Sequence, residues 1–361
     1  MTGTDAERSG VATTSDQAGG WALAPLLVLD QLETYLDAQG LGSGPITWRR
    51  IGDGHSNITF SIERGEAALV LRRGPRPPFP PSAHNMVREA RIQRALSDGG
   101  YPTPTIVTIC EDTEILGVPF YLMEFVDGVV MTDRVPPGAE SDDVRHAMAT
   151  TAVDSLVSLH AVDLHGDLGT FARPEGYLSR QVDRFAGLWP MNTRRSLPLV
   201  DQLATWLRAN LPETRKHSVV HGDYRLGNLM FDRTRPHLLA AVMDWEMATL
   251  GDPLADLGYF TATYSDNAFP ATCMELSPTT RLPGFPGRGY IRDYYSDATG
   301  LDLSALPWYE ALALWKAAIF SEAIYTRWLD GERPGDAFGP TLERGVPELL
   351  DCARAAADSL P

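Results

Sequence analysis

The sequence predicts an α+β fold in two parts, a smaller one made mainly of antiparallel strands and a larger one made mainly of helices. Short apolar runs separated by turn residues fill residues 21–126, and such runs are typical of strands. Apolar side chains three and four residues apart recur through residues 127–361, which is the spacing of a buried helix face. A chain of 361 residues can hold two parts of this kind, each with its own core.

The chain begins with residues 1–20, which are rich in small and polar side chains and predict a disordered tail. These residues lack the basic and apolar segments of a secretory signal. Leucines at helical spacing then predict an amphipathic opening helix over residues 26–39.

Strands and a glycine-rich loop follow the opening helix. Residues 46–60 predict strand, loop and strand, with Gly52 and Gly54 in the loop. Glycines let the backbone approach a ligand closely, and exposed amides in such a loop can bind phosphate oxygens. A simple hairpin turn is the alternative for this loop. Residues 67–73 predict the third strand, which ends in two arginines.

The later elements follow from the same two periodicities. Further strands are predicted at residues 106–109 and 118–123. The spacing of apolar side chains predicts helices over residues 85–97, 142–160, 177–189 and 199–211. A connector rich in proline and glycine, residues 265–289, precedes further aromatic helices and could form part of a binding pocket.

One stretch concentrates polar residues that can carry chemistry. Residues 221–228, with the sequence His-Gly-Asp-Tyr-Arg-Leu-Gly-Asn, lie between two apolar runs and predict strand, tight loop and strand. Asp223 and Asn228 are five residues apart, which is also the interval in the protein-kinase catalytic loop. Sixteen residues after Asn228, another apolar run ends at Asp244.

These residue types suit phosphoryl transfer from ATP, which depends on positioning and charge neutralisation. Asp223 is the candidate base that takes the proton of an accepting hydroxyl. Asn228 and Asp244 offer the oxygen ligands that Mg²⁺ prefers. Each of the three alone could be a turn residue or a helix cap, but the ordered set favours a catalytic site.

The ordered residues His221-Gly222-Asp223, Asn228 and Asp244-Trp245-Glu246 resemble the aminoglycoside phosphotransferase and choline kinase family. The later segments are most similar to the phosphotransferase domains joined to acyl-CoA dehydrogenases. The resemblance spans about residues 25–330. It implies a two-lobed protein-kinase-like fold, ATP and Mg²⁺ as cofactors, and a small-molecule hydroxyl as acceptor.

The same resemblance assigns a nucleotide site to the first lobe. It implies that Ser56 and Asn57 complete a phosphate-binding loop with the two glycines. Kinase-like enzymes place a lysine in the third strand, but here Arg72 occupies the matching position. Arginine can bind phosphate through two donors, although it does not replace lysine exactly. Glu89 matches the helix glutamate that pairs with this cation; a charged helix face is the alternative.

Two further sets of residues are implied by the resemblance. Residues 124–128 match a hinge, so the carbonyl of Glu124 and the amide of Val126 are expected to meet the adenine edge, with Met123 lining the pocket. Asp256 matches a carboxylate that supports the catalytic loop by accepting backbone hydrogen bonds.

Charge and composition limit the partners. The chain has 31 basic and 47 acidic residues, a net charge of −16, which argues against a nucleic-acid partner and is compatible with a cationic substrate. Only two of the basic residues are lysines, Lys216 and Lys316. No apolar run is long enough to span a membrane. Three widely spaced cysteines show neither metal nor disulfide spacing and favour a cytoplasmic location.

The sequence therefore favours an ATP- and Mg²⁺-dependent phosphotransferase that acts on a small-molecule hydroxyl. A nucleotide-binding regulator without turnover is the alternative, because Arg72 replaces the usual lysine. A protein kinase is disfavoured, since no Ala-Pro-Glu segment follows Asp244. The acceptor stays open between an aminoglycoside, a macrolide-like compound and a hydroxyacyl compound. Aromatic residues of the last third mildly favour an apolar alcohol, although most of them are expected in the core.

Overall fold

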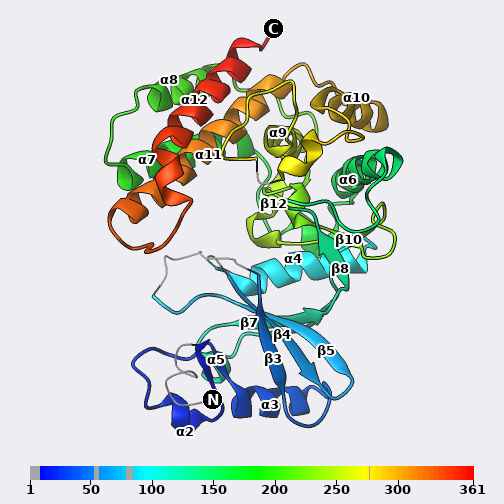
Figure 1. Cartoon of the computed structure of the whole chain (residues 1–361), viewed down its shortest axis with the longest axis vertical. Coiled ribbons are helices and arrows are strands. Elements are labelled where there is room, and N and C mark those ends of the chain that lie inside the picture. The colour runs from blue at the N-terminus through cyan, green and yellow to red at the C-terminus, as the bar shows by residue number, and fades with distance from the viewer. Residues whose placement is uncertain (1–8, 53–56, 79–83, 276) are drawn as a thin grey trace. The chain divides into compact units, whose positions relative to one another are not determined.

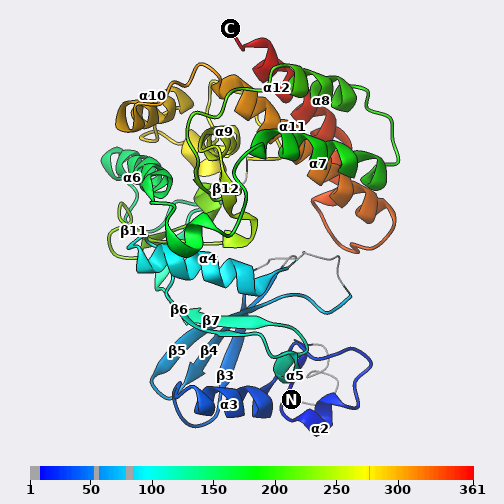
Figure 2. The same cartoon turned by 180° about the vertical axis from the view of Figure 1, so that it is seen from behind.

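The computed structural model describes residues 9–52, 57–78, 84–275 and 277–361. The chain divides into two compact units, Met1–Val126 and Asp127–Pro361 (Figures 1 and 2). Strands dominate the first unit and helices the second, which confirms the predicted α+β class.

The first unit is built on one five-stranded antiparallel sheet, in the order β3-β4-β5-β7-β6. Every strand pairs with its neighbour in the antiparallel sense, and the predicted third strand is central. The strands are β3 Thr47–Ile51, β4 Ile58–Arg64, β5 Ala67–Arg73, β6 Ile106–Cys110 and β7 Phe120–Glu124.

Alternation along the strands gives the sheet two different faces. Phe60, Leu71 and Leu122 belong to a buried cluster that includes the leucines of helix α3, Leu29–Ala38. Tyr121 projects to the other side, where its hydroxyl donates to helix α4, Met86–Asp98. The two helices therefore cover opposite faces of the sheet (Figures 1 and 2).

The start of the chain differs from the prediction. Residues 9–20, expected to be disordered, contain strand β1, Val11–Ala12, and helix α2, Ser15–Ala18. The first of these pairs in parallel with β2, Leu27–Val28. Val11 and Leu27 are buried, so a few apolar side chains are enough to hold this segment on the unit. Because Leu27–Val28 belong to this strand pair, the opening helix starts at Leu29, three residues later than predicted.

Helices make up most of the second unit and surround α11, Leu306–Leu329, which is apolar on nearly every side. Trp308 and Trp315 of α11 are fully buried, and their indole nitrogens donate to carbonyls of α8, Leu199–Ala209. Helices α7, α8, α9 and α12 all contact α11. The helices are α6 Asp142–Ala161, α7 Tyr177–Asn192, α8 Leu199–Ala209, α9 Leu254–Thr263, α10 Arg288–Thr299, α11 Leu306–Leu329 and α12 Leu342–Asp358.

Two small sheets of the second unit frame the polar stretch. Strands β8, Gly128–Val130, β10, Leu229–Asp232, and β11, Leu239–Val242, form an antiparallel sheet in the order β11-β10-β8. Strand β9, Ser218–Val220, pairs with β12, Thr249–Gly251. The predicted pattern of strand, tight loop and strand around residues 221–228 is confirmed by β9 and β10.

Short helical turns complete the chain. Helix α5 covers Thr113–Leu116, and the 3₁₀ turns are η1 Gly166–Gly169, η2 Leu226–Asn228, η3 Trp245–Met247, η4 Pro278–Arg281 and η5 Gly339–Thr341. Among the described residues, no helix combines the length and the hydrophobicity that a membrane span requires.

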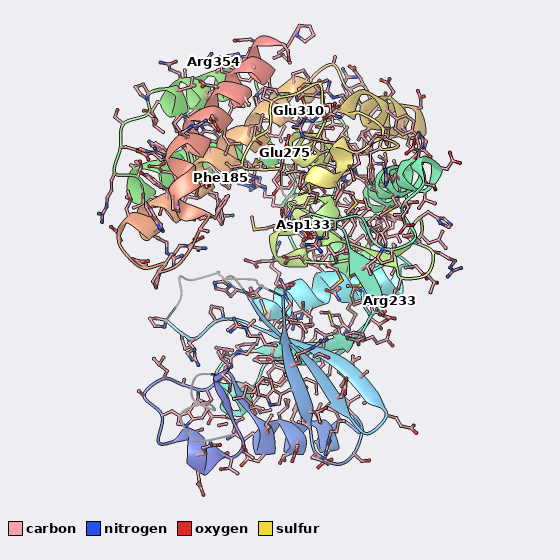
Figure 3. All side chains as sticks on the ribbon, viewed as in Figure 1. Asp133, Phe185, Arg233, Glu275, Glu310 and Arg354 are labelled. Atoms are coloured by element: carbon pink, nitrogen blue, oxygen red, sulfur yellow. The ribbon has the colours of Figure 1, made fainter. Side chains whose placement is uncertain are left out.

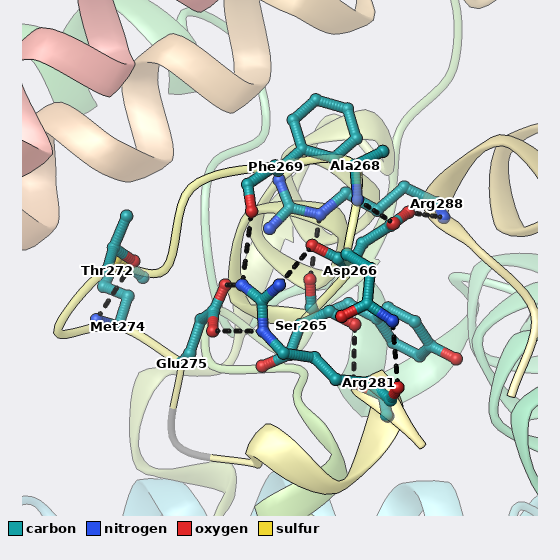
Figure 4. A network of polar contacts seen from close by, with 12 residues as sticks. Ser265, Asp266, Ala268, Phe269, Thr272, Met274, Glu275, Arg281 and Arg288 are labelled. Atoms are coloured by element: carbon teal, nitrogen blue, oxygen red, sulfur yellow. Dashed lines mark hydrogen bonds and ion pairs between the residues drawn. The ribbon is translucent and has the colours of Figure 1, made fainter. Parts of the chain in front are cut away.

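The connector predicted at residues 265–289 is folded rather than structureless. Arg281 pairs with Glu275 at 2.6 Å and donates to the carbonyl of Asp266 (Figure 4). The side chain of Asp266 accepts from the amide of Arg288, whose guanidinium lies over Phe269. Arg281 and Arg288 therefore link several of the described residues of the connector to one another.

Candidate active site

The polar stretch places Asp223 and Asn228 in direct contact. The side-chain amide of Asn228 donates to the Asp223 carboxylate, Nδ2 to Oδ2, at 2.8 Å and to the carbonyl of Asp223 at 2.9 Å. Both side chains are shielded, with 25% of the Asp223 side chain exposed and Asn228 buried. Because the nitrogen of the amide is committed to Asp223, its carbonyl oxygen is directed the other way, toward any further ligand.

Backbone pairing brings Asp244 beside Asn228. Leu229 at the start of β10 pairs with Val242 at the end of β11, and the amide of Met243 donates to the carbonyl of Asn228 at 2.8 Å. Asp244 is the next residue, and it adopts φ 67° and ψ 69°. This left-handed conformation is uncommon for a residue with a side chain and costs on the order of 1 kcal/mol.

His221 ties the two loops together. Its Nε2 lies 2.9 Å from the carbonyl oxygen of Met243, and its ring packs against Trp245 with the centroids 4.6 Å apart. Gly222 follows with φ 84°, and a Cβ on it would lie 2.8 Å from the carbonyl oxygen of Met247. Glycine is therefore required where the loop of residues 221–228 crosses the loop that carries Asp244.

Asp256 supports the loop as expected. It accepts the backbone amides of His221 at 2.6 Å and Gly222 at 2.8 Å, one on each carboxylate oxygen. His160 of α6 lies 3.3 Å from the same carboxylate and hydrogen-bonds to Tyr295 on its other nitrogen. Asp256 is fully buried, so these three donors replace the water that its charge would otherwise need.

Two neighbours of Asp223 were missed by sequence reasoning. Tyr259 donates its hydroxyl to Oδ1 of Asp223 at 2.5 Å, and Nε of Arg225 lies 3.4 Å from the same oxygen. Loss of water around the ring, and then the charge of Asp223, raise the pKa of Tyr259 well above its ordinary value, so the hydroxyl stays a donor. Tyr259 lies three residues after Asp256 on α9, and this helical spacing is the one signal that could have revealed it.

The predicted ion pair of the first unit is present. Nε of Arg72 on β5 lies 2.9 Å from Glu89 on α4, and 15% of the Arg72 side chain is exposed. Tyr121 donates to the same carboxylate oxygen at 3.0 Å. Asn57 donates to the other oxygen at 3.4 Å, so it meets the ion pair. His84 in turn hydrogen-bonds to Asn57, and neither it nor Tyr121 was predicted.

The other residues predicted for the nucleotide site lie on or near strands β7 and β3, or outside the described residues. Met123 is buried, and its sulfur lies 3.5 Å from the side-chain nitrogen of Gln93. Glu124 is the exposed last residue of β7, and Val126 is the last residue of the first unit. Gly52 directly follows β3 with φ 76°, whereas Gly54 and Ser56 lie outside the described residues.

The described residues hold no group of three or more His, Cys, Asp or Glu side chains that could bind a metal ion. The predicted Mg²⁺ site uses only one such side chain, Asp244, together with the amide oxygen of Asn228. Magnesium sites of this kind take their remaining ligands from substrate phosphate and water.

The comparison with protein families gives the decisive observation. Residues 47–284 match the model of the phosphotransferase enzyme family, which covers more than half of the chain and includes every predicted site residue. The chain belongs to the phosphotransferase enzyme family.

Relatives of this chain occur inside larger proteins. Acyl-CoA dehydrogenase family member 10 of Mus musculus is 35% identical over 310 residues, which is 84% of this chain and 29% of that protein. Acyl-CoA dehydrogenase family member 11 of Homo sapiens is 31% identical over 317 residues, 84% of this chain and 40% of that protein. The chain thus spans less than half the length of these relatives.

Solved structures confirm the kinase-like fold of the chain. A Ralstonia eutropha protein, provisionally named an aminoglycoside phosphotransferase, has a TM-score of 0.78 at 28% identity and covers 92% of this chain and 98% of its own. Aminoglycoside phosphotransferase APH(4)-Ia with ADP and hygromycin B has a TM-score of 0.58 at 15% identity, covering 91% and 98%. Choline kinase from Cryptosporidium parvum has a TM-score of 0.58 at 14% identity, covering 87% and 90%.

Proposed function

We propose that this phosphotransferase moves the γ-phosphoryl group of ATP to a hydroxyl of a small molecule, with Asp223 as the base. The observation that carries the proposal is the fixed carboxylate of Asp223. Asn228 holds one of its oxygens, and Tyr259 and Arg225 hold the other. A carboxylate fixed in this way can accept a proton from one direction without first reorganising.

The transfer balances as a single displacement. The acceptor oxygen forms a bond to the γ-phosphorus while the bond from that phosphorus to the oxygen shared with the β-phosphate breaks, which releases ADP. The acceptor proton passes to Asp223 as the new bond forms. Asp256 contributes by holding the backbone from which Asp223 projects.

The chain's own donors fit a magnesium ion. The side-chain oxygen of Asn228 and the carboxylate of Asp244 are hard oxygen ligands, and Asp244 directly follows Met243, whose amide donates to the backbone carbonyl of Asn228. The left-handed conformation of Asp244 is a strained geometry of the kind that proteins keep at ligand sites. Bound there, Mg²⁺ would neutralise charge on the phosphate oxygens.

The ion pair of the first unit supports a nucleotide-phosphate site. Glu89 orients the guanidinium of Arg72, which offers a planar pair of donors for phosphate in place of the ammonium of lysine. We assign phosphate contacts also to the loop of Gly52, Gly54, Ser56 and Asn57, and adenine contacts to Met123, Glu124 and Val126. Because an arginine stands at this position, a nucleotide-binding regulator without turnover is the second candidate function.

A direct test separates the two candidates. ADP release from ATP is measured with a panel of aminoglycosides, macrolides, choline-like amines and hydroxyacyl compounds, for the wild type and for Asp223→Asn. We expect turnover with one class and a loss of about a thousandfold in the variant, with affinity for a non-hydrolysable ATP analogue kept within about threefold. Tight analogue binding without turnover on any acceptor would instead favour the regulator.

A further inference from the structure

A small cavity lies beside the proposed base in the helical unit. Its wall includes Gly222 of the catalytic loop, Asp256 and Tyr259 of α9, Tyr177 of α7, and Lys316 of α11. Tyr259 both lines this cavity and donates to Asp223. The cavity volume is about 20 Å³, so one small end group of a larger molecule could enter it and would lie close to the base.

Lys316 is the unusual group in the cavity wall. Its ammonium donates to Oε1 of Gln181 at 3.0 Å and lies 4.7 Å from the centre of the Phe185 ring, both on α7 (Figure 3 labels Phe185). Within the described part of the chain, no carboxylate lies within ion-pair distance of it. A partly buried ammonium held by an amide and an aromatic ring has donors left over for another group.

The carboxylates nearest to Lys316 are not available to neutralise its charge. Loss of water and the nearby Arg184 lower the pKa of Lys316 to about 8, while the negative charges of Asp256 and Asp223 act in the opposite direction. Both carboxylates already have donors of their own, from backbone amides, Tyr259 and Asn228. Burial and the positive charge of the exposed Arg184 both disfavour the charged form of Lys316, and an added anion would favour it.

Resting on the proposed function, we infer that Lys316 binds an anionic group of the acceptor, so that the substrate is a hydroxy compound bearing a carboxylate or a phosphate. Gln181 and Phe185 fix the ammonium on one side, and the cavity gives the anion access on the other. The contact between Lys316 and the anionic group of the acceptor then positions the hydroxyl of the same molecule at Asp223. A polycationic acceptor is disfavoured, because its ammonium groups would meet Lys316 and Arg184.

The chain has only two lysines, so anion binding at Lys316 can be observed directly by NMR, without measuring turnover. Protein labelled with ¹³C and ¹⁵N at lysine gives two side-chain signals by NMR, and the exposed Lys216→Gln variant leaves only that of Lys316. Short hydroxy carboxylates, the matching hydroxyalkyl phosphates and the matching neutral hydroxy amides are then titrated. We expect one of the two anion classes to shift the Lys316 signal saturably and the amides to leave it unchanged. A signal that ignores both anions, or follows the amide equally, overturns the inference.

Turnover provides the second arm. For the preferred anionic acceptor, Lys316→Gln lowers kcat/KM by about tenfold or more, whereas Lys316→Arg keeps the preference for the anion over its amide and Lys216→Gln behaves as wild type. An unchanged preference in a folded Lys316→Gln protein overturns the inference even if phosphoryl transfer is confirmed. Conversely, anion binding at Lys316 without phosphoryl transfer to any acceptor counts against the proposed function and upholds the anion site.

Discussion

At the scale of single residues, the candidate base Asp223 is held by donors on both of its carboxylate oxygens. Tyr259 and Asn228 donate to different oxygens of Asp223, at 2.5 Å and 2.8 Å. A hydrogen bond from a neutral hydroxyl to a carboxylate is charge-assisted and therefore short. Without one of these donors, the carboxylate of Asp223 would still be present but could rotate.

Tyr259→Phe tests this positioning role. We expect kcat to fall about ten- to a hundredfold with KM for ATP little changed, because the base is misplaced while the nucleotide site is intact. Steady-state kinetics measure both parameters. Tyr294→Phe is the matched control, since Tyr294 also donates to a carboxylate, Asp154, but on an exposed surface. Equal kinetics in the two variants would show that Tyr259 does not position the base.

Residues at the site divide by how they can be recognised in the sequence. Asp223, Asn228 and Asp244 lie close to apolar runs in a fixed order, so the local sequence is enough to identify them as candidates. Tyr259 and Lys316 lie on helices rich in apolar residues and meet the site only through packing. From the sequence alone, a tyrosine or a single lysine in such a helix is predicted to pack in the core or at its border.

At the scale of elements, α9 supports the loop of residues 221–228. Asp256 and Tyr259 lie three residues apart and so on one helix face, where one holds the loop backbone and the other holds its carboxylate. Asp252, just before the helix, accepts the amide of Leu254 and the hydroxyl of Tyr309. The helix is thereby fixed at its start, close to the loop it supports.

Asp256→Asn tests the support given by α9. The amide can accept at only one of its two terminal atoms, so one loop amide loses its partner in a buried site, and we expect unfolding to become easier by about 2–3 kcal/mol. Activity should fall as well, because the loop is displaced. Urea denaturation and initial rates measure the two effects. Asp293→Asn, at an exposed position of α10, should change stability by less than about 0.5 kcal/mol.

Element boundaries show where local pattern is sufficient. The predicted helix over residues 142–160 agrees with α6, Asp142–Ala161, because Ser141 caps it and acidic residues occupy its first turn. The opening helix was placed three residues early, because Leu27–Val28 pairs with a distant strand. Partners far away in the sequence leave no local signal.

At the scale of the whole molecule, the α+β class and the family could be predicted from the sequence, whereas the packing of the helical unit could not. Arg195 shows why. It pairs with Glu322 of α11 at 2.7 Å and donates to the carbonyls of Leu342 and Glu343 at the start of α12. One guanidinium therefore joins three segments, and nothing in its local sequence distinguishes it from a solvated arginine.

Glu322→Gln tests this link. The carboxylate is 1% exposed, so its loss leaves a guanidinium with an incomplete set of partners, and we expect a destabilisation of about 3 kcal/mol. The midpoint of urea denaturation measures it. Glu348→Gln breaks an exposed pair with Arg344 and should cost about 0.5 kcal/mol or less. Similar losses in both variants would show that the buried link adds nothing.

The central claim is that Asn228 and Asp244 provide the metal side of the site and Asp223 the acceptor side. The most direct measurement is the binding of Mn²⁺, in place of Mg²⁺, followed by electron paramagnetic resonance with a non-hydrolysable ATP analogue present. We predict that Asp244→Asn weakens Mn²⁺ binding by about tenfold or more, while Asp223→Asn stays within about twofold of the wild type. Wild-type Mn²⁺ affinity in Asp244→Asn would contradict the account.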